Sequence, residues 1–172
     1  RSLDEALAEL GALAVQANQP HVDKRIRPHP NGVPEIEAEY IGSKKSGAYA
    51  EYWSNGQKKA EGRYLDDIAT GTWTHFFYNG VVQSQGVIHR GVRDGPWQHF
   101  FASGARKSVE SFRQGVADGH WVTWFESGQI ESESFFDKGL ADGRERHWYE
   151  RGNPASDGTF VKGFAEGLFT TW

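Results

Sequence analysis

Three histidines are the residues of this 172-residue chain whose type and spacing come nearest to a metal site. His75, His99 and His147 fall at multiples of 24 residues. Equivalent residues of successive β-hairpins lie about 10 Å apart, whereas zinc needs nitrogens about 2.0–2.1 Å from one ion. We therefore expect these histidines to pack as polar groups between aromatic rings, and we expect no metal site.

A row of acidic residues follows the same interval, each immediately before a glycine. Its members are Asp94, Asp118, Asp142 and Glu166. Calcium needs six or more oxygen ligands, which side chains about 10 Å apart cannot share. We expect the acidic side chains to hydrogen-bond their own backbone in turns.

Motifs for covalent or cofactor chemistry are missing from the chain. It has no cysteine and no G-x-S-x-G, H-E-x-x-H, phosphate-loop or dinucleotide pattern. A serine nucleophile also needs a base held beside it. The sequence predicts a protein that is not an enzyme and binds no cofactor.

The interval of 24 residues is an internal repeat. Five full copies run from residue 47 to 166, a degenerate copy precedes them at 23–46, and a half copy ends at Trp172. Glycines open the copies at Gly47, Gly71, Gly95, Gly119, Gly143 and Gly167. Aromatic residues recur in further columns, of which one holds Tyr52, Phe76, Phe100, Trp124, Trp148 and Trp172.

Each copy predicts a β-hairpin. Pairs such as Asn79–Gly80 favour a two-residue turn between strands, and a longer glycine-containing turn follows. The fold class is therefore an all-β repeat protein, an elongated twisted antiparallel meander. Counting from the turn places Trp73 opposite Gly86 and Trp121 opposite Ser134, and we expect each ring to lie over the small residue that it faces.

The aromatic column from Tyr52 to Trp172, called here the aromatic stripe, is the candidate binding site. Alternation puts it on the face opposite Trp73 and Phe77, beside long polar side chains of the partner strands: Lys59, Gln83, Lys107 and Glu131. Aromatic rings dominate protein contact surfaces. Two interpretations remain open, since the stripe either contacts a partner or is covered by neighbouring side-chain stems.

Residues 1–22 differ from the repeats. Ser2 and Glu5 have capping-box spacing, and leucines then recur on one face, predicting a helix at about residues 3–16. It either caps the first strand or makes a dimer contact. In the copy at 23–46, Pro28, Pro30 and Pro34 predict extended coil in place of the first strand.

The pattern G-x-W-x-x-F-F-x-x-G…F-x-x-G-x-x-D-G, clear in Gly95–Gly119 and Gly119–Gly143, resembles the MORN-repeat variant of bacterial proteins, including the YwqK-type antitoxins. The resemblance covers about residues 31–172. It implies a scaffold for protein–protein contacts, or a partner that is bound and neutralised, and it supplies no catalytic residues. Glu145 in the tryptophan column and Asp67 at a turn glycine depart from the pattern.

We expect a protein–protein interaction module that presents a sheet face to a protein or peptide. The alternatives are a self-assembling scaffold, through the helix or the open C-terminal edge, and glycan or lipid-headgroup binding by the stripe. A net charge of −4 disfavours nucleic acid and anionic membranes, and no apolar run is long enough to span a membrane. Exported, periplasmic and cytoplasmic locations stay open, with the missing methionine and cysteine favouring export or a chain trimmed at Arg1.

Overall fold

One antiparallel sheet of 16 strands forms the protein in a computed structural model that describes residues 2, 4–5, 7–8 and 20–172. The long strands are β1 (Val22–Pro28), β2 (Pro34–Ile41), β3 (Lys44–Tyr52), β4 (Lys58–Leu65), β5 (Ile68–Phe76), β6 (Val82–His89), β8 (Gly95–Phe100), β9 (Arg106–Arg113), β11 (Gly119–Trp124), β12 (Ile130–Asp137), β14 (Gly143–Trp148), β15 (Pro154–Val161) and β16 (Phe164–Thr171). Three two-residue strands, β7 (Val92–Arg93), β10 (Val116–Ala117) and β13 (Leu140–Ala141), pair beside the turns.

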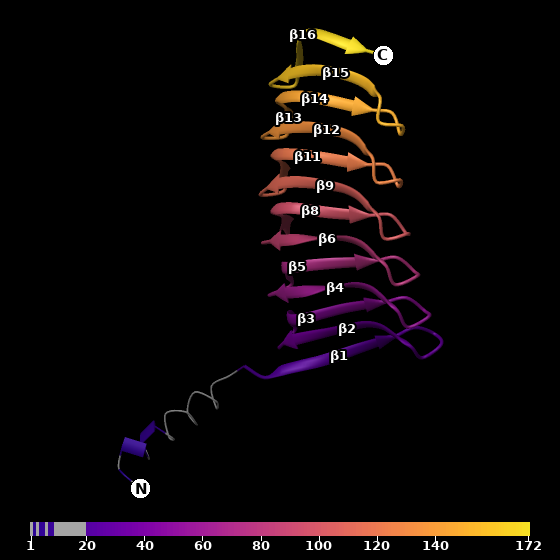
Figure 1. Cartoon of the computed structure of the whole chain (residues 1–172). Helices are drawn as coiled ribbons and strands as arrows, with labels where there is room; N and C mark the ends of the chain where they lie inside the picture. Colours follow the sequence, from indigo (N-terminus) through magenta and orange to yellow (C-terminus); the bar gives the residue numbers. More distant parts are fainter. Residues whose placement is uncertain (1, 3, 6, 9–19) are drawn as a thin grey trace.

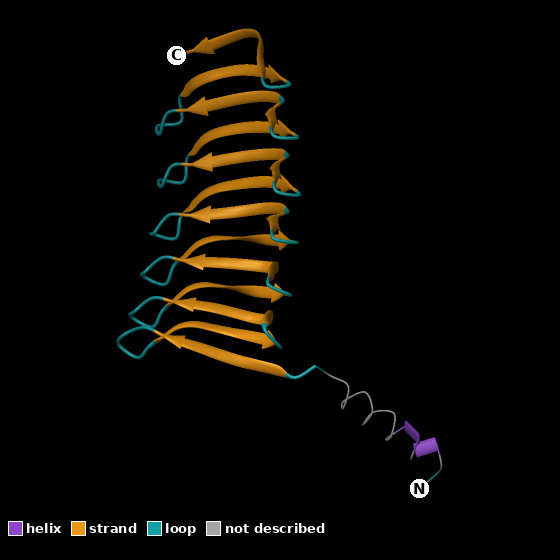
Figure 2. Cartoon of the chain, turned by 180° about the vertical axis from the view of Figure 1, so that it is seen from behind, coloured by secondary structure: helices purple, strands orange, loops and turns teal. Residues whose placement is uncertain are grey.

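The long strands stack in sequence order from β1 to β16, as Figure 1 shows from bottom to top. Each 24-residue copy supplies two of them, and the two kinds of turn line opposite edges of the sheet (Figure 2). The predicted all-β meander is therefore confirmed. Because the sheet is a single layer, each hairpin buries its side chains mainly against the hairpins before and after it.

The tight turns are linked from copy to copy by side chains. In one of them, the backbone N–H of Phe77 donates to Val81 O at 2.8 Å, so the turn holds three residues and the predicted two-residue turn is wrong. Gly80 adopts a φ of 83° that favours glycine. The Asn79 side chain donates to Ala102 O of the next copy at 3.0 Å. Asn31 and Asn55 make the same contact in the two earlier copies, so this edge is tied together beyond its strand pairing.

At the opposite edge, acidic turn residues also bond neighbouring copies. The Asp94 carboxylate accepts a bond from the Gln114 N–H of the next copy at 3.2 Å, and Asp67 Oδ1 accepts from Lys45 N of the preceding copy at 2.9 Å. The expectation that the acidic row bonds its own backbone is therefore wrong for Asp94. Asp67 replaces the turn glycine and takes a φ of 67°, which aspartate tolerates better than most residues.

The strand register agrees with the count from the turns, because Trp73 pairs with Gly86 and Trp121 with Ser134. The expectation that the Trp73 ring lies over Gly86, the residue paired with it, is wrong, however. The Trp73 ring lies over Gly62 on the preceding strand, where an added Cβ would collide with it, and Gly86 is instead covered by Trp97. Each of these two rings therefore covers a glycine of the copy before its own and ties the two copies together.

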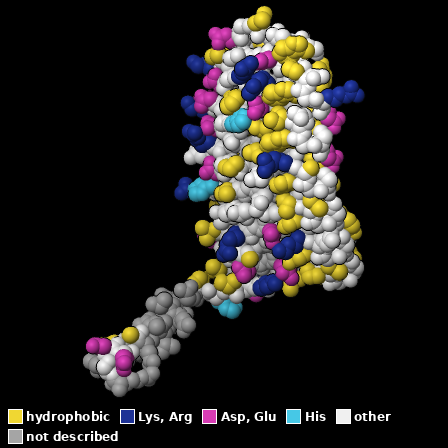
Figure 3. All heavy atoms as spheres, viewed as in Figure 1, with side chains coloured by type: hydrophobic (Ala, Val, Ile, Leu, Met, Phe, Trp, Pro, Cys, Tyr) yellow, Lys and Arg dark blue, Asp and Glu magenta, His cyan; other side chains and the backbone are white. Residues whose placement is uncertain are grey.

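We call the side of the sheet that carries Tyr49, Trp73, Trp97 and Trp121 the ladder face, and the side that carries the aromatic stripe the stripe face. The ladder face holds the best-buried large residues, with Trp97 2% and Trp73 6% exposed. Tyr64 contacts Trp73 edge-on, with ring centroids 5.3 Å apart. Packing of such rings from strand to strand joins the copies. Figure 3 shows one face of the sheet, on which hydrophobic side chains also gather in columns across the strands.

A β-bulge lies near each tight turn, and because of it the predicted neighbours of the stripe are wrong. Between His75 and Phe76 the register shifts by one residue, and the same shift recurs in the other full copies. The extra residue on the partner strand turns to the ladder face. Lys59 accordingly bonds Glu51, and Glu131 accepts a bond from Thr123, both on the ladder face. The residues beside the stripe are instead Lys58, Val82, Arg106, Ile130 and Pro154.

The degenerate first copy forms a hairpin, so the predicted coil is wrong. β1 pairs with β2 from Val22 to Pro28, and the His29 N–H donates to Val33 O at 2.7 Å as in the later tight turns. Two of the prolines lie at strand ends, where a missing N–H costs little.

Most of the helix predicted at residues 3–16 lies outside the described residues, so it stays a prediction. Asp4, Glu5, Leu7 and Ala8 have helical backbone. The Ser2 N–H donates to Glu5 Oε2 at 3.1 Å and the Glu5 N–H to Ser2 Oγ at 3.3 Å, which is a reciprocal capping pair.

Candidate functional site

The aromatic stripe crosses the sheet on one face, with one ring from every second strand. Tyr52, Phe76, Phe100, Trp124 and Trp148 are all half-buried, and Trp172 is 60% exposed. The structure thus brings the six predicted residues into one row, each ring keeping part of its surface accessible. Whether a partner uses that surface remains a prediction.

Arginine side chains cover part of two stripe rings. The Arg106 guanidinium lies 5.3 Å from the centroid of the Trp124 ring, and Arg146 lies 5.3 Å from that of Trp148. Such cation–π contacts are worth about 0.5–1 kcal/mol at exposed sites. In this arrangement each guanidinium group covers only part of its ring. Its N–H groups can still donate to a further acceptor.

Next to the stripe, a row of uncharged side chains crosses the middle of the sheet. Strand pairing joins its members in order, as Thr74, Gln85, Gln98, Val109 and Val122. Glu61 pairs with the first residue of the row and Glu133 with the last. At about 4.8 Å per strand, the uncharged row spans about 20 Å. The central stripe face therefore offers aromatic, aliphatic and amide groups without a carboxylate.

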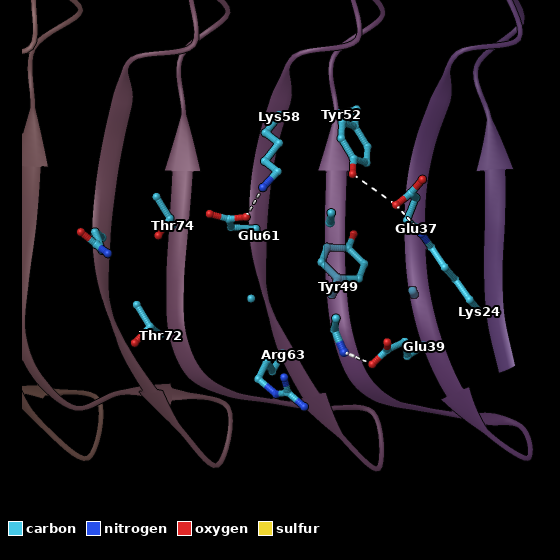
Figure 4. A pocket seen from close by; sticks show the side chains of 15 residues that line it. Lys24, Glu37, Glu39, Tyr49, Tyr52, Lys58, Glu61, Arg63, Thr72 and Thr74 are labelled. Carbon is cyan, nitrogen blue, oxygen red and sulfur yellow. Dashed lines mark hydrogen bonds and ion pairs between the residues drawn. The ribbon is translucent and has the colours of Figure 1, made fainter. Parts of the chain in front are cut away.

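At the N-terminal end of the row, the stripe face is hollowed into an open groove of about 510 Å³ (Figure 4). Four of its charged side chains form two ion pairs. Lys24 Nζ lies 2.9 Å from Glu37 Oε2, and Lys58 Nζ lies 2.5 Å from Glu61 Oε2. The hydrogen bond from Lys24 is the main cause that lowers the pKa of Glu37. Tyr52 also donates to Glu37 at 3.2 Å, so the first stripe ring is fixed to the groove wall.

Ion pairs bound the row at its C-terminal end as well. Arg146 contacts Glu133 at 2.6 Å, and Arg144 donates from Nε and Nη2 to the two carboxylate oxygens of Asp157. The Arg144 bonds lower the pKa of Asp157. Both ends of the stripe face are thus polar and carry ion pairs, whereas its centre is uncharged along the row. A partner can displace water from this centre without breaking an ion pair.

The histidine column lies on the ladder face and packs as predicted at His75. That ring lies between Trp73 and Trp97, with centroids 6.3 and 6.4 Å away, and its Nδ1 lies 3.3 Å from Ser84 Oγ. Burial is the first cause that lowers the pKa of His75, followed by the charge of Arg93. Among residues 20–172 and the few described before them, no three His, Cys, Asp or Glu side chains gather as metal ligands.

Glu110 is a carboxylate in a column that otherwise holds small residues. The column comprises Ala38, Gly62, Gly86, Ser134 and Gly158. Glu110 Oε2 lies 3.5 Å from His99 Nε2 and 3.7 Å from an Arg93 nitrogen, and Ser108 donates to its other oxygen at 3.2 Å. The contact with His99 is the main cause that lowers the pKa of Glu110, and partial burial opposes it.

An apolar ridge at the edge of the longer turns escaped sequence reasoning. Its members recur every 24 residues and are between 42% and 78% exposed: Ile68, Val92, Val116, Leu140 and Phe164. Each of the first four lies beside the turn glycine of the following copy, so closely that a Cβ added to that glycine would touch it. The same periodicity that identifies the glycine columns would have revealed this one.

Two further comparisons bear on the site. The family model described as MORN repeat variant matches residues 117–138, from β10 to the turn after β12. A comparison with curated proteins finds no match for this chain. None of the described residues belongs to a helix long and apolar enough to cross a membrane.

Proposed function

Since residues 117–138 are a MORN repeat variant, and five full copies of their 24-residue spacing build the sheet, we propose that the chain is a non-enzymatic binding module. Its stripe face binds an extended segment of another protein. The segment lies across the strands, along the aromatic stripe and the uncharged row beside it.

The observation that carries this proposal is the uncharged row beside half-exposed rings. Aromatic rings release water readily and lose little conformational freedom on binding. Gln85 and Gln98 offer amide donors and acceptors at the centre of the row. A partner segment with apolar side chains and few charges fits this centre, because an unpaired charge buried there would cost several kcal/mol.

An antitoxin-like role is a narrower form of the same proposal. In it, the stripe face covers a functional surface of the partner and so neutralises it. The resemblance of the repeats to antitoxin-associated proteins supports this form, which requires the same surface.

Adjacent residues on opposite faces give matched variants for the test. Trp124→Ala and Trp148→Ala remove stripe rings, whereas Phe125→Ala and Tyr149→Ala remove their neighbours on the ladder face. We expect the stripe double variant to lose the partner recovered from a lysate of the source cells, and the ladder double variant to retain it. Circular dichroism and thermal unfolding would verify that both remain folded. Equal recovery by the two folded variants would refute the stripe as the binding surface.

A further inference from the structure

Two positions of the repeat touch across the hairpin on the ladder face. In one copy Lys59 Nζ lies 2.7 Å from Glu51 Oε1. Three copies later, in the same positions, Thr123 Oγ1 donates to Glu131 Oε2 at 3.1 Å. Each pair combines one donor with one acceptor, so these two copies satisfy the contact internally.

The copy with His99 and Lys107 in these positions lacks a carboxylate there. Its lysine is placed as in the first pair, since Lys107 Nζ lies 5.7 Å from the Phe101 ring centroid and Lys59 Nζ lies 5.0 Å from that of Trp53. Within the part of the chain that the structure describes, Lys107 has no ion-pair partner. His99 Nε2 is buried without a hydrogen bond, its nearest carboxylate oxygen being that of Glu110 at 3.5 Å.

A hollow of about 400 Å³ lies beside these two side chains. Its polar lining consists of His75, Gln83, Ser84, Arg93, His99 and Lys107, with no carboxylate among the lining residues. Glu110 lies 3.7 Å from Arg93 and offsets that charge, but Lys107 remains in excess. The local field and the available donors therefore both favour an anion.

We propose that this hollow binds a carboxylate, supplied by an acidic side chain of a partner polypeptide. The carboxylate is to Lys107 what the Glu51 carboxylate is to Lys59 in the earlier copy. It accepts from Lys107 Nζ, and the His99 ring lies beside it in the wall of the hollow. The site lies on the ladder face, so it is independent of the function proposed for the stripe face.

The full chain would be titrated with N-acetylglutamate N-methylamide while NMR follows the His99 ring. The neutral glutamine derivative, inorganic phosphate and chloride serve as comparison probes. We expect saturable shifts at His99 with the glutamate derivative alone. Lys107→Gln should weaken binding about tenfold, a change of about 1.4 kcal/mol, whereas Lys59→Gln should leave it unchanged because Lys59 already has its carboxylate.

A second variant tests the proposal by giving Lys107 a carboxylate partner within the chain. His99→Glu restores the lysine–glutamate pair of the first copy and should abolish binding of the glutamate derivative, which in this variant is followed at the backbone amide of Lys107. Absence of saturation, equal shifts with chloride, or binding of phosphate alone would overturn the proposal. Unaltered binding by folded Lys107→Gln would also overturn it.

Discussion

The indole ring of Trp97 lies over Gly86 of the preceding strand so closely that a Cβ at residue 86 would collide with the ring. Trp97 is 2% exposed, and its Nε1 donates to Val87 O at 3.1 Å. The same relationship joins Trp73 to Gly62 and Phe169 to Gly158. Packing of a ring of one copy on a glycine of the copy before it thus holds successive copies of the sheet together.

Gly86→Ala should destabilise the protein by about 1–3 kcal/mol, because the methyl group must displace the ring. Gly86 is absent from the residues with positive φ, so backbone strain does not contribute. Trp97→Ala alone should cost about 3–5 kcal/mol. In the double variant the methyl group occupies vacated space, so the two costs should fall well short of additive in urea unfolding. Simple additivity would show that the ring does not cover Gly86.

Asn79→Ala should cost about 1 kcal/mol, because the Asn79 side chain bonds both Val81 N in its own turn and Ala102 O in the next copy. Asn153→Ala is the matched control, since Asn153 lies next to a tight-turn glycine without such a link and should change stability by less than about 0.5 kcal/mol. Thermal unfolding of the two variants makes the comparison. Equal effects would mean that the link between copies contributes nothing.

Acid should remove the stability that Glu110 contributes. The pKa of its folded-state carboxyl is lowered, chiefly by His99, so the contribution is complete above the ordinary value of 4.5 and disappears as pH falls through the folded-state pKa. The stability difference between wild type and Glu110→Gln should therefore shrink progressively as pH falls below 4.5. A difference that stays constant in urea unfolding over this range would contradict the assignment.

Alkali should act through Tyr49, whose pKa burial raises to about 12. Its ring packs against Tyr64 with centroids 5.2 Å apart. Because unfolding restores the ordinary value of 10.0, the folded protein binds the proton more tightly and loses stability from about pH 10 to about pH 12. Tyr49→Phe should lose less stability over this range, and the tyrosinate absorbance step near pH 12 should vanish. An unchanged step would place that titration elsewhere.

The turn chemistry and the aromatic columns were sufficient to predict the hairpins, their register and the two faces. The count from Asn79–Gly80 gives the correct partner of Trp73 because two departures from it cancel: the turn holds one residue more than predicted, and the bulge shifts the register back by one. The bulge before Phe76 could not be predicted, because the extra residue on the partner strand carries no distinctive type. Missing it put Lys59 and its equivalents on the wrong face.

Other errors concern direction in space. Strand counting gives the residue that pairs with each tryptophan but not the neighbouring strand over which the ring lies. Gly86 was therefore expected beneath Trp73, whereas Trp97 covers it. The six stripe residues were predicted individually, since period-2 alternation fixes their face. The groove beside Tyr52 escaped prediction because its walls consist of ordinary charged residues whose pairing, as in Lys24 and Glu37, depends on the register of a strand predicted to be coil.

The central claim is that the stripe face, and not the ladder face, contacts the partner. Trp124 and Phe125 are adjacent, half-buried and on opposite faces, and Phe125 does not line the hollow proposed to bind a carboxylate. A photo-crosslinking phenylalanine analogue at each position therefore compares the faces directly. In source cells we expect the stripe-face partner to crosslink from position 124 and not from position 125. A crosslink of that partner from position 125 alone, or equal crosslinks from both positions, would contradict the account.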